Sequence, residues 1–138
     1  MIEGELTPDK LNDLIKGSLS AHLGIEYLEV GQGFLKARMP VEDRTRQPFG
    51  YLHGGASAAL AEEVGSMAAN LTLNTTKSVA VGLEINANHI RSVKSGFITA
   101  IATPLHVGNS TQVWEIKMYN NEEQLTCISR LTMAVISK

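Results

Sequence analysis

The chain has 138 residues, of which 43% are hydrophobic, 19% charged and 5% aromatic. This composition predicts one compact soluble domain over residues 1–138, and the single Cys127 agrees with a cytoplasmic protein that folds without a disulfide. The net charge of −2 comes from interspersed charges, which argues against nucleic acid or an anionic membrane as partner. The acidic first ten residues lack the apolar run of a signal peptide, and the longest apolar segment contains charged residues that disfavour a membrane span.

The first half of the chain predicts a short helix, a hairpin and a loop. Thr7 before a proline is typical of a helix start, and apolar residues at helical spacing continue to about Gly17. Two segments, 25–30 and 34–39, are rich in strand formers and joined by a glycine-containing turn, which predicts a β-hairpin. The polar segment 40–52 contains proline and glycine and predicts a loop.

The second half predicts one long helix and four long strands. Residues 53–70 are helix formers or small residues without proline, so they favour a helix of about five turns. From Ser78 onward apolar and polar residues alternate in four segments separated by turns: 79–88, 97–107, 111–119 and 125–136. The late segments lack crossover helices, so the predicted fold class is α+β, with about six antiparallel strands around one central helix.

The predicted long helix has two different faces. Leu60, Val64 and Met67 form an apolar stripe suited to a core. On the opposite side Glu62 is surrounded by small residues, namely Gly55, Ala58, Gly65, Ser66 and Ala69. Small residues allow close approach by a backbone or a ligand, so we expect Glu62 to be crowded, as useful acid–base groups are. A solvent-facing helix former is the alternative for Glu62 and the simpler interpretation of Glu63.

The start of this helix is a candidate oxyanion site. Gly54 and Gly55 occupy its first turn, where backbone N–H groups lack helical partners and lie at the positive end of the helix dipole. Donors placed there can stabilise the oxyanion that forms when an acyl carbon is attacked. Gln47 and His53 are candidate side-chain donors nearby. The alternative is that the glycines only let the helix pack tightly.

Later polar residues suggest a second part of the site. His89 and Arg91 share one face of the first strand after the helix. Arg91 is suited to the phosphate of a nucleotide-bearing substrate, and a surface ion pair is its alternative role. Trp114 and Cys127, on later strands, are interpreted as packing residues.

Taken together, three blocks resemble the hotdog-fold acyl-CoA thioesterases, in the branch that acts on aromatic acyl groups. The blocks are RTRQPFGYLHGGAS at 44–57 followed by Glu62, GLEINANH at 82–89, and PLHVG at 104–108 followed by QVW. They span nearly the whole chain. The similarity is greatest to bacterial dihydroxynaphthoyl-CoA hydrolases and to proofreading thioesterases of aryl carrier proteins. Tyr51 departs from the aliphatic residue common in relatives, which leaves the choice of acyl group open.

The resemblance implies a hotdog fold assembled as a dimer of dimers, with each active site between two subunits. Glu62 of one subunit would attack the thioester or activate water, while the Gly54 N–H of the other would polarise the carbonyl. The remaining implied residues are His53, Gln47 and Ser66 for catalysis, and Met67, His89, Arg91 and Ser92 for substrate binding. The substrate would be a small acyl-CoA or an acyl group on an aryl carrier protein. No cofactor is expected besides the coenzyme A of the substrate.

The predicted function is therefore hydrolysis of an acyl-CoA, with an aromatic acyl group preferred. A noncatalytic module that binds acyl-CoA or a carrier protein on the same fold is the main alternative. A metal enzyme built on His53, His89, His106 and Glu62 is disfavoured because the chain lacks a close ligand pair, and no metal is expected. A serine hydrolase using Ser57 is disfavoured because the second glycine of the nucleophile elbow is missing.

Overall fold

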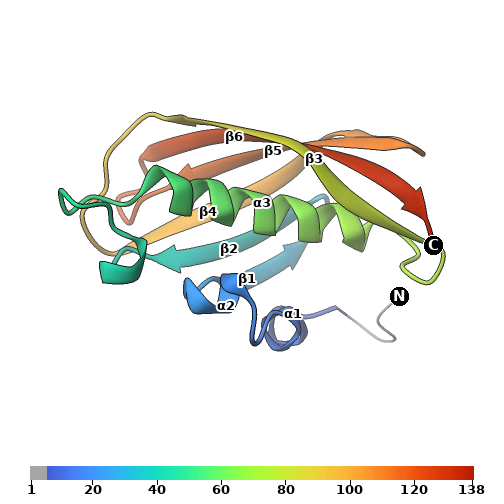
Figure 1. Cartoon of the computed structure of the whole chain (residues 1–138), viewed down its shortest axis with the longest axis horizontal. Helices are drawn as coiled ribbons and strands as arrows, with labels where there is room; N and C mark the ends of the chain where they lie inside the picture. Colours follow the sequence, from blue (N-terminus) through green and yellow to red (C-terminus); the bar gives the residue numbers. More distant parts are fainter. Residues whose placement is uncertain (1–5) are drawn as a thin grey trace.

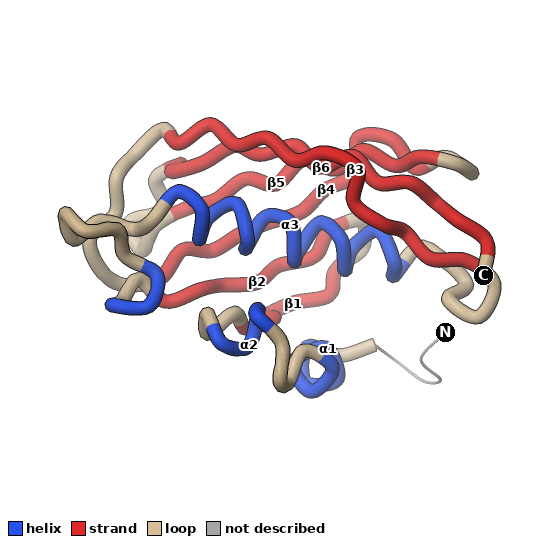
Figure 2. Tube along the Cα trace, viewed as in Figure 1, coloured by secondary structure: helices blue, strands red, loops and turns tan. Residues whose placement is uncertain are grey.

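A long helix lies against a six-stranded antiparallel sheet in the computed structural model, which describes residues 6–138 (Figure 1). The strand order is β1-β2-β4-β5-β6-β3, and strands lie both above and below the helix in Figure 2. This arrangement confirms the predicted fold class. The elements in chain order are α1 (Pro8–Leu14), α2 (Leu19–His22), β1 (Glu26–Gly31), β2 (Phe34–Pro40), the 3-10 helix η1 (Asp43–Thr45), α3 (Gly54–Leu71), β3 (Ser78–His89), β4 (Phe97–Val107), β5 (Thr111–Tyr119) and β6 (Leu125–Ser137).

The predicted hairpin, long helix and four later strands match the observed elements to within about two residues. Thr7 caps α1 as expected, its hydroxyl accepting from the Lys10 N–H. Two short elements, α2 and η1, were not predicted. A helix of one turn shows no apolar periodicity, so the sequence pattern carries no signal for it.

The prediction that no signal peptide begins the chain falls partly on residues 1–5, which lie outside the described residues. Within residues 6–138, no helix has both the length and the apolar character needed to cross a membrane.

The sheet buries a wide arc of α3. Leu60 and Val64 are fully buried, as the predicted apolar stripe requires. Gly65 and Ala69 are buried as well, and a Cβ on Gly65 would lie 2.7 Å from Leu131 Cδ2. Gly65 thus allows a close approach, as expected of a small residue, but the group that approaches is the core side chain of Leu131. Gly65 and Ala69 belong to the core and line neither hollow beside Glu62. Because the sheet lies above and below α3, it covers more of the helix circumference than one apolar stripe indicates.

Asn70 joins the end of α3 to the edge strand β3. Its Oδ1 accepts from the Ala80 N–H at 2.9 Å, and its Nδ2 donates to the Ala80 carbonyl at 3.1 Å. The side chain thus pairs with β3 as a neighbouring strand would. As a result, β3 is fixed alongside the face of α3 that carries the exposed Glu62 and the half-buried Ser66.

Candidate active site

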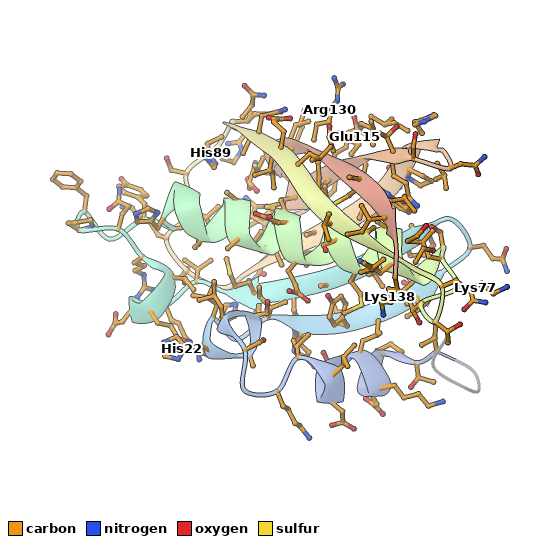
Figure 3. The ribbon with its side chains drawn as sticks, turned by 45° about the vertical axis from the view of Figure 1, so that its right-hand side comes forward. His22, Lys77, His89, Glu115, Arg130 and Lys138 are labelled. Atoms are coloured by element: carbon orange, nitrogen blue, oxygen red, sulfur yellow. The ribbon has the colours of Figure 1, made fainter. Side chains whose placement is uncertain are left out.

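A polar cleft of about 270 Å³ opens beside the first turn of α3. The loop before the helix, the end of β3 and the segment after β3 form its walls. Figure 3 shows His89 at the end of β3, close to the start of α3. Several predicted site residues therefore lie together here, and the full lining is Gln47, Leu52, Gly54, Ser57, His89, Ile90, Arg91, Ser92, Val93 and Thr126.

Hydrogen-bond donors are available in this cleft. Among residues 6–138, no acceptor is paired with the Gly54 N–H, as expected at the first position of a helix. Gln47 Oε1 accepts from the Phe49 N–H, which fixes the amide and leaves its Nε2 as a donor. A Cβ on Gly54 would lie 2.9 Å from His89 Nε2, so glycine permits the imidazole to lie against the first turn. An oxygen that gains negative charge can be stabilised at this place.

His53 is the N-cap of α3 rather than part of the cleft lining. Its Nδ1 accepts from the Gly55 N–H at 2.8 Å, and its ring is otherwise exposed. This contact orients the first turn and explains why the helix begins at Gly54. The expected role of His53 in orienting a thioester stays a prediction.

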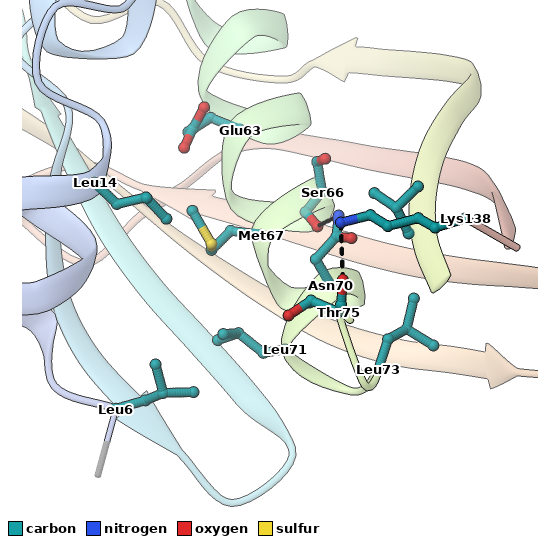
Figure 4. A pocket seen from close by; sticks show the side chains of 11 residues that line it. Leu6, Leu14, Glu63, Ser66, Met67, Asn70, Leu71, Leu73, Thr75 and Lys138 are labelled. Atoms are coloured by element: carbon teal, nitrogen blue, oxygen red, sulfur yellow. Dashed lines mark hydrogen bonds between the residues drawn. The ribbon is translucent and has the colours of Figure 1, made fainter. Parts of the chain in front are cut away.

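Two further hollows lie beside the middle of α3. Glu62 and Ser66 line one of about 330 Å³, between α3 and the segment that contains α2. Ser66 and Met67 line a larger, mainly apolar hollow of about 510 Å³, shown in Figure 4. A Cβ added at Gly82 of β3 would lie 3.2 Å from Glu62 Oε1, so the carboxylate also lies next to β3. These hollows can hold an apolar acyl group next to a carboxylate.

The two adjacent glutamates have surroundings opposite to those predicted. Glu62 is exposed, and within residues 6–138 its carboxylate makes no ion pair or hydrogen bond, so the expectation of a crowded Glu62 is wrong for a single chain. Glu63 is half-buried and accepts hydrogen bonds from the Tyr27 and Ser20 hydroxyls, each at 2.5 Å. Burial and then the charge of Glu63 raise the pKa of Tyr27 above its ordinary value. The cause of the reversal is tertiary, since the hydroxyls of Ser20 in α2 and Tyr27 in β1 bond to Glu63 and not to Glu62.

The predicted catalytic residues fall into two separate groups on one chain. Gly54 and Glu62 are eight residues apart on a continuous helix, which places them about 12 Å apart along its axis. The cleft at Gly54 and the hollow at Glu62 share no lining residue, so in one chain the donor and the carboxylate open onto different cavities.

Sequence reasoning missed part of the cleft. Thr126 lines it, and the Thr126 carbonyl accepts from the Ile90 and Arg91 N–H groups at 2.8 and 3.2 Å. These bonds hold Arg91 at the cleft although β3 ends at His89. Contacts between a loop and a strand so distant in sequence leave no local pattern. Ser57, considered above only as a nucleophile, also lines the cleft.

No three His, Cys, Asp or Glu side chains gather into a metal-binding group within the described part of the chain. His53 and His89 lie at the first turn of α3, as described above. His106 is distant in sequence and lies against Gly108, where an added Cβ would be 2.6 Å from its Nε2.

The fold and the polar cleft at the first turn of its central helix are suited to a protein that polarises acyl carbonyls. The chain belongs to the thioesterase superfamily, whose family model matches residues 49–127. It is 50% identical to the proofreading thioesterase EntH of Cronobacter turicensis over 131 residues, 95% of each chain. It is 45% identical to the 1,4-dihydroxy-2-naphthoyl-CoA hydrolase of Escherichia coli over 132 residues, 96% of each chain.

A solved structure agrees with these sequence relationships. The crystal structure of a thioesterase from Haemophilus influenzae superposes with a TM-score of 0.94 and 49% identity, covering 98% of this chain and 94% of that chain. The hotdog fold inferred from the resemblance is confirmed, and the protein is a thioester hydrolase.

Proposed function

We propose that this thioesterase hydrolyses aromatic acyl-CoA esters at a site shared by two copies of the chain. Glu62 of one copy faces the thioester, and the Gly54 N–H of the other holds its carbonyl oxygen. The observation that carries the proposal is the separation of these two groups. Glu62 is exposed, Gly54 has an N–H without an acceptor among the described residues, and about 12 Å of helix divides them.

The chemistry follows from the charges of the two groups. Attack on the thioester carbon moves negative charge onto the carbonyl oxygen, where the Gly54 N–H and the Gln47 amide stabilise it. Glu62 acts either as a general base, taking a proton from the attacking water, or as a nucleophile that forms an anhydride which water then cleaves. In both routes the C–S bond breaks and the thiolate of coenzyme A leaves. Ser66, one turn beyond Glu62, positions the water or the carboxylate, and no cofactor takes part.

Binding of the substrate divides between the two regions. Arg91, with His89 and Ser92, lies in the polar cleft and interacts with the nucleotide end of coenzyme A, because a guanidinium matches a phosphate. Met67 and the apolar hollow receive the acyl group. The name of one relative, a 1,4-dihydroxy-2-naphthoyl-CoA hydrolase, supports an aromatic acyl group on coenzyme A. The name of another, a proofreading thioesterase, supports a carrier protein as the acyl donor. An aryl carrier protein is the alternative acyl donor, and a dimer of dimers is the proposed assembly.

The substitution Glu62→Gln tests this proposal. It keeps the size of the side chain and removes its basicity, so we expect kcat to fall by about 10²–10⁴-fold while binding of the ester is largely retained. The matched control is Glu122→Gln, an exposed glutamate in the turn between β5 and β6, which is expected to leave kcat unchanged. A panel of benzoyl, naphthoyl and straight-chain acyl-CoA esters measures the preference. Unchanged hydrolysis by Glu62→Gln contradicts the role of Glu62, and faster hydrolysis of straight-chain esters contradicts the aromatic preference.

A further inference from the structure

Glu63 is a half-buried anion with only neutral partners. Its Oε1 accepts from the Tyr27 hydroxyl and its Oε2 from the Ser20 hydroxyl. No Lys, Arg or His within residues 6–138 forms an ion pair with it. Both hydroxyls hold the carboxylate in one place and neither neutralises its charge. The negative charge of Glu63 therefore acts on any group that binds beside it.

That space is where an acyl group lies next to Glu62. Glu63 and Ser66 are shared by the walls of both hollows along α3, the one that contains Glu62 and the larger apolar one. The other walls include Leu19, Leu23 and Met67, which screen charge poorly. An acyl group that extends from the reacting carbon into either hollow thus lies within range of Glu63.

Positive charge near these hollows is placed away from Glu63. The hollow with Glu62 is lined by two carboxylates and by no Lys or Arg of the described chain. Lys138 lines only the larger hollow, and its Nζ donates to the Thr75 carbonyl at 2.8 Å. Figure 4 shows Lys138 apart from Glu63, with Ser66 between them. An acyl group with a second carboxylate would meet like charges before it could reach this cation.

We infer that Glu63 is a specificity-determining residue, which makes this thioesterase reject acyl groups that carry a second carboxylate and accept uncharged ones. The inference rests on the proposed function of the Glu62 site. Two like charges about 5 Å apart repel strongly in a partly buried site, where the effective dielectric constant is about 20. A neutral acyl group of the same shape avoids this repulsion and keeps the apolar contacts.

Two thioesters of equal shape test the inference: 4-carboxybenzoyl-CoA and 4-carbamoylbenzoyl-CoA. They differ by one negative charge, so the ratio of their kcat/KM values reports charge rather than fit. For the wild-type protein we expect the neutral ester to be favoured by at least about tenfold. In Glu63→Gln the ratio is expected to fall several-fold, because the charge is gone while the side chain still bonds to both hydroxyls. Glu122→Gln, which removes a distant charge, is expected to keep the wild-type ratio.

A second variant tests the inference if Glu63→Gln does not fold. The triple variant Ser20→Ala, Tyr27→Phe, Glu63→Met replaces the whole network by apolar groups and leaves no buried partner unpaired. A reduced ratio in either folded variant supports the inference. An unchanged ratio overturns it, and so does a wild-type preference for the anionic ester, which would assign the recognition to Lys138. If the wild-type protein hydrolyses 4-carbamoylbenzoyl-CoA but the ratio of the kcat/KM values is the same in the Glu63 variants, only the inference fails. If the wild-type protein hydrolyses no acyl-CoA, the proposed function fails as well.

Discussion

The first turn of α3 and its middle both carry functional groups, but the fold gives them opposite chemistry. The first turn offers N–H donors, an amide and a guanidinium in a polar cleft. The middle offers two carboxylates next to mainly apolar hollows. Donors that stabilise an oxyanion and a carboxylate that attacks must meet at one carbon, yet a helix keeps residues eight positions apart at a fixed distance. The proposed site therefore requires the first turn of one copy and the middle of α3 of another.

At the first turn, the largest effect is expected from Gly54→Pro, which removes the N–H of Gly54. Proline suits the first position of a helix, and His53 already has φ −68° and ψ 131°, which a following proline permits. We therefore expect the fold to be retained and kcat to fall by about 100-fold or more, as loss of an oxyanion donor does. Gly54→Ala keeps the N–H and adds the methyl group that meets His89, so it separates the two effects. If kcat falls as much in Gly54→Ala as in Gly54→Pro, the space beside His89 matters and the N–H donor does not.

A mixing experiment tests whether the halves come from two copies. Glu62→Gln and Gly54→Pro are each expected to be nearly inactive, but in a mixed dimer one site receives the intact Glu62 and the intact Gly54. After the two variants are unfolded and refolded together, random pairing gives about a quarter of the wild-type sites, since half of the dimers are mixed and half of their sites are intact.

Activity of the refolded mixture, compared with each variant refolded alone, is the measurement. Recovery to about 25% of wild-type activity supports a shared site. Activity that stays at the level of the single variants contradicts it, provided that size-exclusion chromatography finds the mixture assembled like the wild type.

The smallest effect concerns Tyr27, whose hydroxyl donates to Glu63 in the middle of α3. Tyr27→Phe removes one hydrogen bond to a charged group, so we expect the free energy of unfolding to fall by about 1.5–3 kcal/mol at neutral pH. Because the pKa of Tyr27 is raised in the folded state, its contribution is complete below the ordinary value of 10.0 and is lost as pH rises beyond it.

Urea unfolding at several pH values between 8 and 11 measures this. Above pH 10 the wild type is expected to lose about 1.4 kcal/mol per pH unit more than Tyr27→Phe, since only the wild type has this phenol. Equal pH dependence of the two proteins would mean that Tyr27 is ionised as easily in the folded as in the unfolded chain.

Much of the fold could be predicted because its signals are local. The alternation in β3 to β6, the Thr7 cap of α1 and the proline-free segment of α3 each depend on residues close in sequence. The short α2 could not be predicted, yet its Ser20 hydroxyl donates to Glu63, and its residues form part of the hollow beside Glu62. A one-turn helix is stabilised by its neighbours, so its own sequence does not reveal it.

The sequence by itself determined the order of the elements, the glycine pair at the first turn of α3 and the position of Glu62 one helix turn before Ser66. These follow from periodicity, capping and helical spacing, which are properties of short segments. Only the tertiary structure decided that Glu63 is the half-buried carboxylate, that Gly65 belongs to the core and that Arg91 reaches the cleft. The reason is that burial depends on which elements pack beside a residue, and those neighbours come from distant parts of the chain.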